Sequence, residues 1–522
     1  MIMKLFYMKN KKLFLLPILI AFTFTLISCN KKIIVFSRNT PESACDYYTV
    51  EMSGNRIQPE RFREISYVHF ELNKDIDVKV NCTEKINEYE ISPLSKKIEG
   101  RVNGNELSFR IPGPGYYVVK VNNKKYLFLL ADSSQDKTVT AKTPGILNVN
   151  DFLPRHEEND IMTTGLQSAL DAASGSGKVL YFPAGIYCTG TLSVKSNTSV
   201  YLASGAVIKG SENRDDYPTD DNRLESDIVN RPKADYTDNG ESMTFSRLVL
   251  IDNAANVHIF GRGVIDGSGS VVRAQGKPAN LIRIRRSHDV LIEGIILRDP
   301  AAWNTHIQFS KNVTLRNVKV INDSEVPNTD GFDPDASKNV LIDHCFAYCN
   351  DDNIAIKTTN NLNLNQDLDS VTIKNCLFMT RKSALKVGTE TKASGMSNIL
   401  FENNDIIVCD RGMVLYSNDG TCINNVRFIN NRFENCYIKG QQRPIHFIIK
   451  ERYGKGKIEN IQIKDCVFYK LFPKSSEIYG LEQNSTVKNI EIDNLVMDGK
   501  RVTTLQNGNI LINSFVNGIK FK

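Results

Sequence analysis

From residue 256 onward, hydrophobic and polar residues alternate in short runs that return at a regular interval along the chain. Each run opens on a small polar residue, alternates apolar and polar positions, passes a second polar residue and closes on an apolar pair. The runs begin at Asn256, Asp289, Asn312, Asn339, Ser370, Asn398, Asn425, Asn460 and Asn489, between 23 and 35 residues apart. Alternation with a period of two is typical of strands, and recurrence at this interval indicates a repeat protein built from strands.

Pairs of short strands without long helical stretches between them predict the coils of a parallel β-helix, an all-β solenoid, over residues 146–522. Leucine-rich repeats are the obvious alternative, but their fixed leucine pattern is absent. A propeller would need about four strands per blade, more than these intervals hold. One helix is expected, over Asp160–Ala173, where it would cover the open first coil and its exposed sheet edge.

The segment before the repeats predicts a separate small domain. Residues 31–132 are rich in short β-type runs, and two of them, Tyr116–Val121 and Lys125–Leu130, are joined by Asn122 and Asn123 as in a hairpin. The polar, threonine-rich residues 133–145 are interpreted as a linker. We therefore expect a small β-sandwich-like accessory domain in front of the solenoid.

Length, charge and cysteine content narrow the class of protein. A chain of 522 residues exceeds what one hydrophobic core usually serves. The net charge of +6 is spread along the chain, and no basic run carries interleaved aromatic residues, so nucleic acid is not an expected partner. Four cysteines share one sequence context and are expected to stack as small buried side chains at equivalent places of the coils: Cys345, Cys376, Cys436 and Cys466.

The N-terminus carries a targeting signal. Lysines at positions 9, 11 and 12 precede the apolar run Leu13–Ile27 and then Ser28 and Cys29, the pattern of a secretory signal over residues 1–28. Residues 26–29 also resemble a bacterial lipobox, which implies diacylation of Cys29. The expected location is the bacterial cell envelope, at the outer membrane or facing the periplasm, as a lipid-anchored monomer. The alternative is an ordinary cleaved signal followed by a chance cysteine.

Two motifs one coil apart carry the candidate chemistry. The first is Asn328-Thr329-Asp330-Gly331-Phe332-Asp333, and the second is Asn350-Asp351-Asp352-Asn353-Ile354-Ala355-Ile356-Lys357. Equivalent positions on successive coils lie one strand spacing apart, so three carboxylates should converge. Paired carboxylates suit glycoside hydrolysis, in which a protonated one expels the leaving oxygen and an ionised one activates water. A lone Asp-Asp pair could equally be a solvated turn or a calcium site.

These motifs, with Val149–Phe152, Val179–Tyr187 and Ser196–Leu202 before them, resemble the polygalacturonases of glycoside hydrolase family 28. The similarity covers about residues 145–470 and lies within the pectin-lyase-like superfamily, so it implies a right-handed parallel β-helix. It also implies inverting hydrolysis of a polysaccharide or oligosaccharide without metal or other cofactor. The family pattern makes Asp351 the acid and gives the water to Asp330 and Asp352. It also implies that Asn328 orients Asp330 or a sugar hydroxyl and that His306 lines the cleft, although His306 could equally be structural. Lys357 and Ser383 are further candidates for substrate binding.

Two elements of the family pattern are missing. Ser383 stands where the family has the histidine of a Gly-His-Gly motif, and Val414 and Tyr416 replace the two cations of its Arg-Ile-Lys motif. Valine cannot pair with a buried carboxylate as arginine does, so plain polygalacturonan is not the expected substrate. Further candidates for substrate binding are Lys386, Arg443 and His446, which would suit an acidic or sulfated glycan, whereas Tyr416 could stack on a neutral sugar.

Two other functions remain open at this point. A polysaccharide lyase on the same fold would need a basic residue that abstracts a proton next to a carboxylate, and no Arg or Lys lies in a lyase-like motif. A non-catalytic glycan-binding surface protein would fit the missing histidine, although the three aspartates are present. Among hydrolases, dextranase-like enzymes also join an N-terminal β-domain to a β-helix, so an α-glucan is a further candidate substrate.

Overall fold

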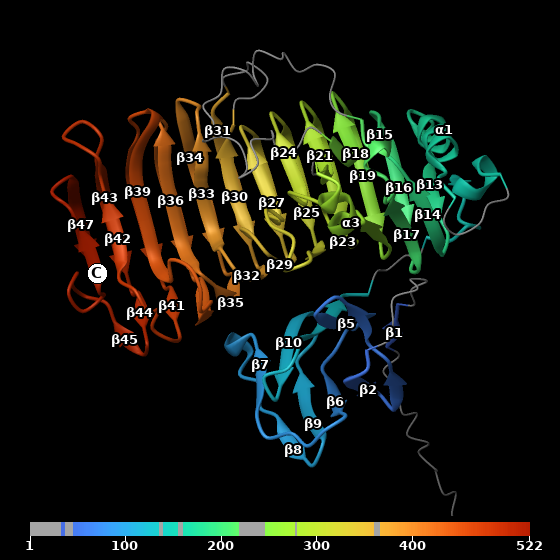
Figure 1. Cartoon of the computed structure of the whole chain (residues 1–522), viewed down its shortest axis with the longest axis horizontal. Coiled ribbons are helices and arrows are strands. Elements are labelled where there is room, and N and C mark those ends of the chain that lie inside the picture. Colours follow the sequence, from blue (N-terminus) through green and yellow to red (C-terminus); the bar gives the residue numbers. More distant parts are fainter. Residues whose placement is uncertain are drawn as a thin grey trace, which may run out of the picture.

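The computed structural model describes residues 33–36, 45–134, 139–154, 160–218, 246–276, 279–359 and 366–522. A long stack of coils forms most of the molecule, and a smaller N-terminal unit lies against one side of it (Figure 1). The predicted signal segment and Cys29 lie outside the described residues. Within the described ranges, no helix has the length and apolar character needed to cross a membrane.

Three long sheets run along the stack, and successive coils add strands to each of them (Figure 1). Sheet 1 consists of β12 (Ile146–Asn148), β13 (Val179–Phe182), β16 (Thr198–Leu202), β19 (Ala255–Gly261), β22 (His288–Glu293), β25 (Lys311–Arg316), β28 (Lys338–Asp343), β31 (Leu368–Lys374), β34 (Gly395–Glu402), β37 (Cys422–Ile429), β40 (Lys457–Lys464), β43 (Val487–Asp493) and β47 (Val516–Phe521). Sheet 2 consists of β14 (Gly185–Thr189), β17 (Ala206–Gly210), β20 (Val264–Asp266), β23 (Ile296–Arg298), β26 (Lys319–Ile321), β29 (Phe346–Cys349), β32 (Leu377–Thr380), β35 (Asp405–Cys409), β38 (Arg432–Cys436), β41 (Val467–Phe468), β44 (Val496–Met497) and β45 (Lys500–Arg501). Sheet 3 consists of β15 (Leu192–Val194), β18 (Ser246–Asp252), β21 (Ala279–Arg285), β24 (Thr305–Gln308), β27 (Phe332–Asp335), β30 (Ile354–Thr358), β33 (Ser383–Thr391), β36 (Arg411–Asp419), β39 (Arg443–Gly454), β42 (Ser476–Tyr479) and β46 (Ile510–Ile512).

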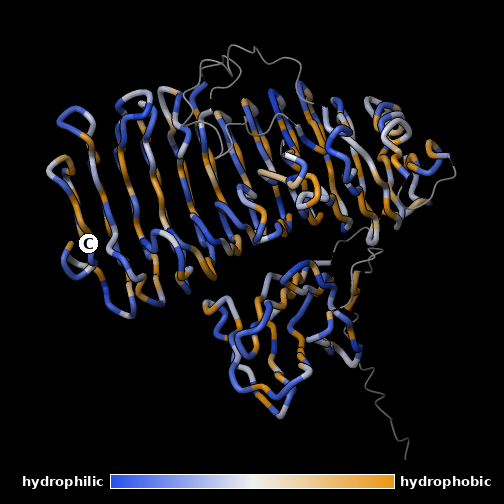
Figure 2. The backbone as a smooth tube through the Cα atoms, in the orientation of Figure 1, coloured by the Kyte–Doolittle hydropathy of each residue, from blue (hydrophilic) through white to orange (hydrophobic). Residues whose placement is uncertain are grey.

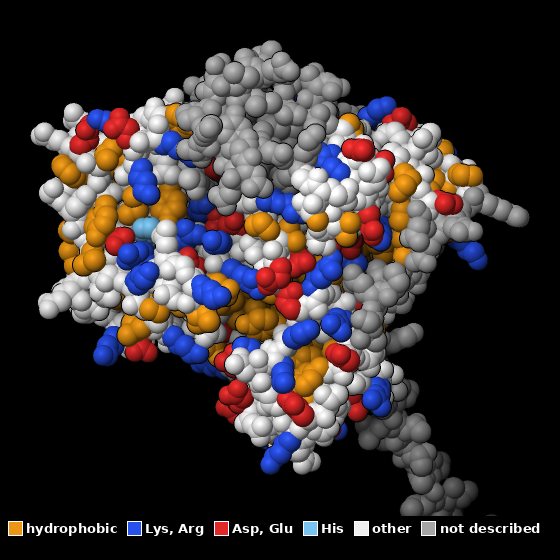
Figure 3. Space-filling view, in the orientation of Figure 1, with side chains coloured by type: hydrophobic (Ala, Val, Ile, Leu, Met, Phe, Trp, Pro, Cys, Tyr) orange, Lys and Arg blue, Asp and Glu red, His pale blue; other side chains and the backbone are white. Residues whose placement is uncertain are grey.

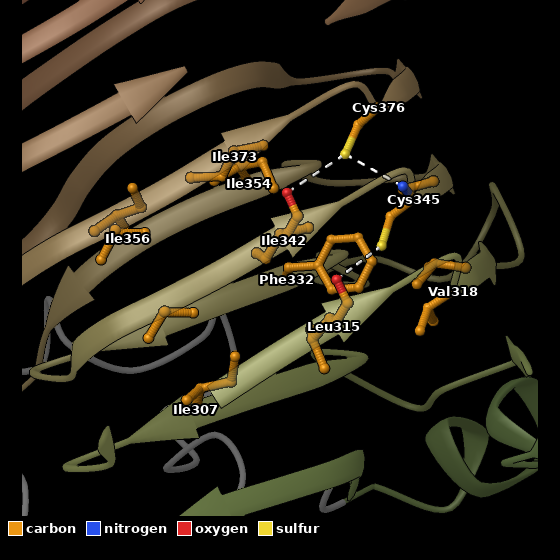
Figure 4. Close-up of a cluster of buried hydrophobic side chains, with 14 of the residues drawn as sticks. Ile307, Leu315, Val318, Phe332, Ile342, Cys345, Ile354, Ile356, Ile373 and Cys376 are labelled. Atoms are coloured by element: carbon orange, nitrogen blue, oxygen red, sulfur yellow. Dashed lines mark hydrogen bonds between the residues drawn. The ribbon is translucent and has the colours of Figure 1, made fainter. Parts of the chain in front are cut away.

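The pairing within these sheets confirms the predicted right-handed parallel β-helix. Apart from the antiparallel β44–β45 pair, neighbouring strands are parallel, and like residues stack on like. Leu315, Ile342 and Ile373 are register partners on successive coils and lie one above another in the interior (Figure 4). Hydrophobic and hydrophilic positions alternate along the same strands (Figure 2), as the period of two predicted.

The polar residue that opens each run has a conformational role. Asn312, Asn339, Asn398 and Asn425 all adopt a left-handed backbone, with φ between 53° and 57°, which asparagine tolerates better than most residues. Their side chains also join the coils, because the Nδ2 of Asn339 donates to the Oδ1 of Asn312 at 2.7 Å and Asn425 donates to Asn398 in the same way. These turns therefore set both the chain direction and the register.

Three of the four predicted stacking cysteines share one ladder. The backbone N–H of Cys345 donates to the Sγ of Cys376 at 3.3 Å (Figure 4). Asn404 and Asn431 continue the ladder, and Asn431 reaches the Sγ of Cys466 at 3.9 Å. The prediction for Cys436 was wrong, because it is the last residue of β38 and pairs with Cys409, whereas the other three cysteines each lie just before a strand. All cysteines in the described ranges are free thiols.

One helix covers the first coil, as predicted, but it begins later. Helix α1 (Thr163–Ala173) buries Leu166, Ala169, Leu170 and Ala173, which share one face at helical spacing. The predicted start at Asp160 was wrong because the N–H of Met162 donates to the carbonyl of Cys188 at 2.8 Å, which ties that residue to sheet 2. A second short helix, α3 (Gly269–Ala274), follows β20 and was not predicted.

The N-terminal unit is a sandwich of two sheets, as expected. One sheet contains β1 (Ile34–Val35), β5 (Ile65–Glu71), β11 (Leu127–Asp132), β10 (Gly115–Val121) and β7 (Tyr89–Ser92), with β4 (Glu60–Phe62) paired to β5. The other contains β3 (Asn55–Ile57), β2 (Tyr48–Met52), β6 (Ile76–Cys82), β9 (Glu106–Ile111) and β8 (Arg101–Asn103). Strands β10 and β11 form the predicted hairpin, with Asn122 and Asn123 in left-handed conformations.

The sandwich is fastened to sheet 2 of the solenoid. Phe128 contacts Phe346 and Tyr348, with ring centroids 5.0 and 5.5 Å apart. Beside this apolar contact, Asp132 is buried against Lys319 at 2.6 Å and His69 at 2.8 Å. Apolar packing and the buried Asp132–Lys319 ion pair thus hold the two units together at sheet 2.

Candidate active site

The two aspartate motifs enter sheet 3 on adjacent coils. Because Phe332 on β27 is the register partner of Ile354 on β30, Asp330 and Asp352 occupy equivalent positions just before these strands. The backbones of the two adjacent coils approach closely here, which requires Gly331, since a Cβ on this residue would lie 2.6 Å from the carbonyl oxygen of Asn353. The predicted convergence of carboxylates is therefore built into the turn before each strand.

Asp351 is the half-buried member of the three. Its Oδ1 accepts the backbone N–H of Asp352 at 3.0 Å, and the Thr380 hydroxyl donates to its backbone carbonyl. Burial, reinforced by the negative charges of Asp330 and Asp352, raises the pKa of Asp351 to about 7. Asp351 is thus a carboxylic acid that keeps its proton up to neutral pH.

Asp352 has the opposite environment. The backbone N–H of Ser383 donates to its Oδ1 at 2.8 Å, the ammonium of Lys386 bonds to its Oδ2, and the Arg411 guanidinium lies 3.9 Å away. Burial alone would raise the pKa of Asp352, but Lys386 and Arg411 outweigh it and lower that pKa to about 2. Neighbouring carboxyls in one sequence motif are thereby held in different protonation states.

A second carboxylate pair lies deeper in the same cluster. The Lys357 ammonium lies 3.1 Å from Asp330 and 2.9 Å from Asp333, and 3.6 Å from the centre of the Trp303 ring. Burial raises the pKa of Asp330 well above its usual value and that of Asp333 to about 6, while Lys357 opposes both shifts. Because the single charge of Lys357 cannot neutralise both carboxylates, Asp330 and Asp333 can share a proton.

Several residues predicted to bind substrate lie below the surface. His306 is 1% exposed and its Nε2 lies 2.9 Å from Asp335. The side chain of Lys357 is 4% exposed and ion-paired, and Ser383 is fully buried. The prediction of direct substrate contact is corrected for these three residues: Lys357 and Ser383 hold the aspartates, and His306 holds Asp335. Asn328 is half-buried and accepts from Arg273 at 3.0 Å rather than bonding to Asp330.

The remaining candidates lie on sheet 3 beyond the aspartates. Lys386 on β33 touches Asp352, as described, and Tyr416 on β36 lies 2.6 Å from the Nδ1 of His446 on β39. Arg443, also on β39, is paired with Glu477 at 2.7 Å. The sequence named Arg443 only as a candidate for binding an acidic or sulfated glycan, and the structure adds that its guanidinium has a carboxylate partner.

Sequence reasoning missed two charged residues of this surface. Arg411 is the register partner of Ser383, and so it follows Asp330 and Asp352 in the same row of sheet 3. Glu477 is the register partner of His446. Aligning the coils on their apolar residues would have placed Arg411, which precedes the Gly412-Met413 pair, in line with the aspartates.

Comparison with known proteins agrees with this geometry. The profile of glycosyl hydrolases family 28 matches residues 225–514, which is more than half of the chain. The exo-poly-alpha-D-galacturonosidase of Dickeya chrysanthemi is 23% identical over 333 residues, which cover 54% of this chain and 54% of that protein. The chain spans about half or less of the length of the first curated relatives that it matches.

Solved structures show the same fold. An exopolygalacturonase from Thermotoga maritima superimposes with a TM-score of 0.56 and 20% identity, over 74% of this chain and 93% of that one. Dex49A from Penicillium minioluteum gives a TM-score of 0.60 at 14% identity and covers 93% of this chain and 96% of its own. The chain belongs to glycosyl hydrolases family 28.

Proposed function

We propose that this protein hydrolyses glycosidic bonds of a polysaccharide or oligosaccharide, with inversion, at the aspartates beside sheet 3. The observation that carries the proposal is the contrast between Asp351, whose pKa is raised to about 7, and its neighbour Asp352, whose pKa is lowered to about 2. Between these values one carboxyl holds a proton while the other is charged, as acid and base catalysis on a sugar requires.

In the proposed reaction, Asp351 gives its proton to the leaving glycosidic oxygen as the bond from that oxygen to the anomeric carbon breaks. Asp352 takes a proton from a water molecule whose oxygen forms the new bond to the same carbon from the opposite face. The protons then exchange with solvent and restore both groups. Asp330, in register with Asp352, would share the positioning of this water, as the family pattern implies, while Lys357 holds Asp330 in place.

The proposed substrate is not plain polygalacturonan. At the positions of the family's cation pair, Val414 is fully buried and Tyr416 bonds to His446. Arg411 and Lys386 are both engaged with Asp352, so they serve the catalytic carboxylate before any group of a substrate. This pattern supports a glycan whose recognition differs from that of a galacturonate polymer.

The test is release of new reducing ends by residues 30–522 from polygalacturonan, rhamnogalacturonan, dextran and a sulfated galactan. Activity on at least one substrate other than polygalacturonan is expected, with the opposite anomer in the first product by NMR. Asp351→Asn is measured beside the wild-type protein and should lose activity. Asp289→Asn is its matched control, because Asp289 stands at a turn where other coils carry asparagine. Unsaturated products that absorb ultraviolet light would replace hydrolysis with the lyase mechanism, and activity confined to polygalacturonan would contradict the substrate proposal.

We further propose that the protein is exported and lipid-anchored at Cys29. The support is the sequence alone: an apolar segment that ends in Leu26-Ile27-Ser28-Cys29 after three lysines. Metabolic labelling with a fatty acid should mark the wild-type chain and fractionate it with membranes. Cys29→Ser should lose the label and leave the membrane fraction. A labelled Cys29→Ser chain, or an unlabelled wild-type chain, would contradict the anchor.

A further inference from the structure

The outward surface of sheet 3 changes character C-terminal to the aspartates. Leu415, Phe447 and Ile478 belong to the buried core of the solenoid, so the residues that follow them on the same strands point outward. These are Tyr416, Ile448 and Tyr479, which are register partners on β36, β39 and β42. Strands lie about 4.8 Å apart, so the row spans about 10 Å and begins on the coil after the one that carries Lys386.

This row contains little charge of its own. Both tyrosines are half-buried and Ile448 is 8% exposed, so the surface consists of ring faces and edges around an aliphatic centre. Over the C-terminal strands, Figure 3 shows hydrophobic side chains gathered around a histidine, with lysine and arginine side chains at the rim. Rings of this kind are the usual partners of the apolar faces of pyranoses, since both bury CH groups against a flat surface.

The ring of Tyr416 is fixed by a chain of hydrogen bonds. Burial, helped by nearby arginines, lowers the pKa of His446 to about 3, so the imidazole is neutral at ordinary pH. A neutral imidazole has one donor and one acceptor nitrogen. Because Nε2 lies 3.4 Å from the Glu477 carboxylate, it carries the proton, and the Tyr416 hydroxyl donates to Nδ1 at 2.6 Å.

The arginines beside the row are already neutralised. Arg443 is paired with Glu477 at 2.7 Å, and Arg411 lies 3.3 Å from Asp410 and 3.9 Å from Asp352. Lys450, two residues after Ile448 on the outward side of β39, is exposed and lies beyond the row, where its charge helps to lower the pKa of His446. A uronate carboxylate placed here would therefore meet the negative charge of Glu477 without an unmatched guanidinium.

We propose that Tyr416, Ile448 and Tyr479 form a subsite for a neutral sugar ring, next to the catalytic aspartates. The ring stacks along the row, and its hydroxyl groups bond to Glu477 and Arg443 at the border. The inference deepens the proposed function, because it rests on cleavage at the neighbouring aspartates to give the subsite its purpose. The substrate is thereby a glycan with an uncharged residue beside the bond that is cut.

The experiment measures retention of full-length Asp351→Asn protein on an array of neutral oligosaccharides, such as those containing rhamnose, galactose or glucose, beside oligogalacturonates and sulfated galactans. A second variant, Asp351→Asn with Tyr479→Ala, is measured in parallel. We expect the second change to weaken binding to neutral glycans about tenfold, the effect of losing one stacked ring. The part of the binding that depends on Tyr479 should be insensitive to salt.

Two further variants keep the result interpretable. Tyr479→Phe retains the ring and should retain binding, whereas Tyr469→Ala, which removes a half-buried tyrosine beyond the end of β41, should have no effect. Binding that Tyr479→Ala leaves unchanged, or Tyr479-dependent binding confined to acidic glycans, would overturn the subsite. Failure of the proposed function is distinct, because it would appear as wild-type protein that binds neutral glycans through Tyr479 without releasing reducing ends.

Discussion

Two buried charge clusters lie on different faces of the solenoid, and they shift the pKa of Asp132 and of Asp351 in opposite directions. At the contact with the sandwich, Asp132 is surrounded by Lys319, His69 and Arg262, and the pKa of Asp132 is held well below its usual range despite burial. At the proposed active site, burial and neighbouring carboxylates raise the pKa of Asp351 instead.

The difference lies in the balance of cations and carboxylates. Asp132 lies beside two cations, Lys319 and Arg262, so ionisation there reinforces the contact between the domains. Asp330, Asp333, Asp351 and Asp352 share one small region with two lysines and Arg411, and the cations do not reach all of them equally. A surplus of buried carboxylates costs stability and provides a proton donor, which is typical of functional sites.

The sharpest way to separate the two clusters is Asp351→Asn. Removal of the proton donor should lower kcat/KM by about 10² to 10⁴, the range for general acid catalysis. Reducing-end release at the pH of maximum activity provides the measurement, and the folded fraction should not fall. Retention of most of the activity would mean that another carboxyl is the acid, and the raised pKa of Asp351 would then have no role in catalysis.

The corresponding change at the domain contact is Asp132→Asn. It leaves Lys319 buried without its anionic partner, so the free energy of unfolding should fall by about 3–5 kcal/mol. Denaturant titration gives the value, with Asp77→Asn as a surface control, whose solvent-exposed pairing with Arg110 should contribute little to stability. Activity per folded molecule should persist. Equal losses for both variants would mean that Asp132 is no more important than a surface aspartate.

The third prediction concerns the pH profile. The wild-type kcat/KM should decline as Asp351 loses its proton above about pH 7, and the acidic limit should follow Asp352, whose pKa is about 2. Lys386→Met removes the strongest lowering effect on Asp352, so the acidic limb should move to higher pH while the basic limb stays. An unchanged acidic limb would show that Lys386 does not control the base.

The smallest expected effect is on stability as a function of pH. The pKa of Asp351 is raised from 3.8 to about 7 in the folded state, so its favourable contribution is complete below about pH 4 and lost as pH rises through about 7. Asp351→Asn lacks this dependence. The melting temperature of the variant relative to wild type should therefore be higher at pH 8 than at pH 4, and a constant difference would argue against the raised pKa.

Much of this architecture follows from local sequence rules. A left-handed turn position favours asparagine, so the recurrent polar residue was a reliable guide to each coil. The aspartate motifs were recognisable because their order and spacing match a coil. Cys436 shows the limit of the approach, since its sequence context imitates that of Cys376 although Cys436 ends a strand and Cys376 precedes one. Context alone does not fix where a turn ends.

Charge partners were harder to foresee than positions. Arg411 reaches Asp352 across two coils, and Arg443 reaches Glu477 on the next coil, with loops of different length between them. The burial of Lys357 and His306 likewise depends on what packs above them. Such pairings depend on the three-dimensional register of the whole sheet, which a single sequence constrains only indirectly.

The asparagine turns described above have a consequence for how this molecule can change over evolutionary time. Since Asn312, Asn339 and Asn425 make the same turn and the same contact to a neighbouring coil, these coils meet their neighbours in the same way at this turn. Duplication or loss of a whole coil would preserve the turns on both sides of the junction. The outward surface of sheet 3 can therefore lengthen or shorten in discrete steps away from the aspartates.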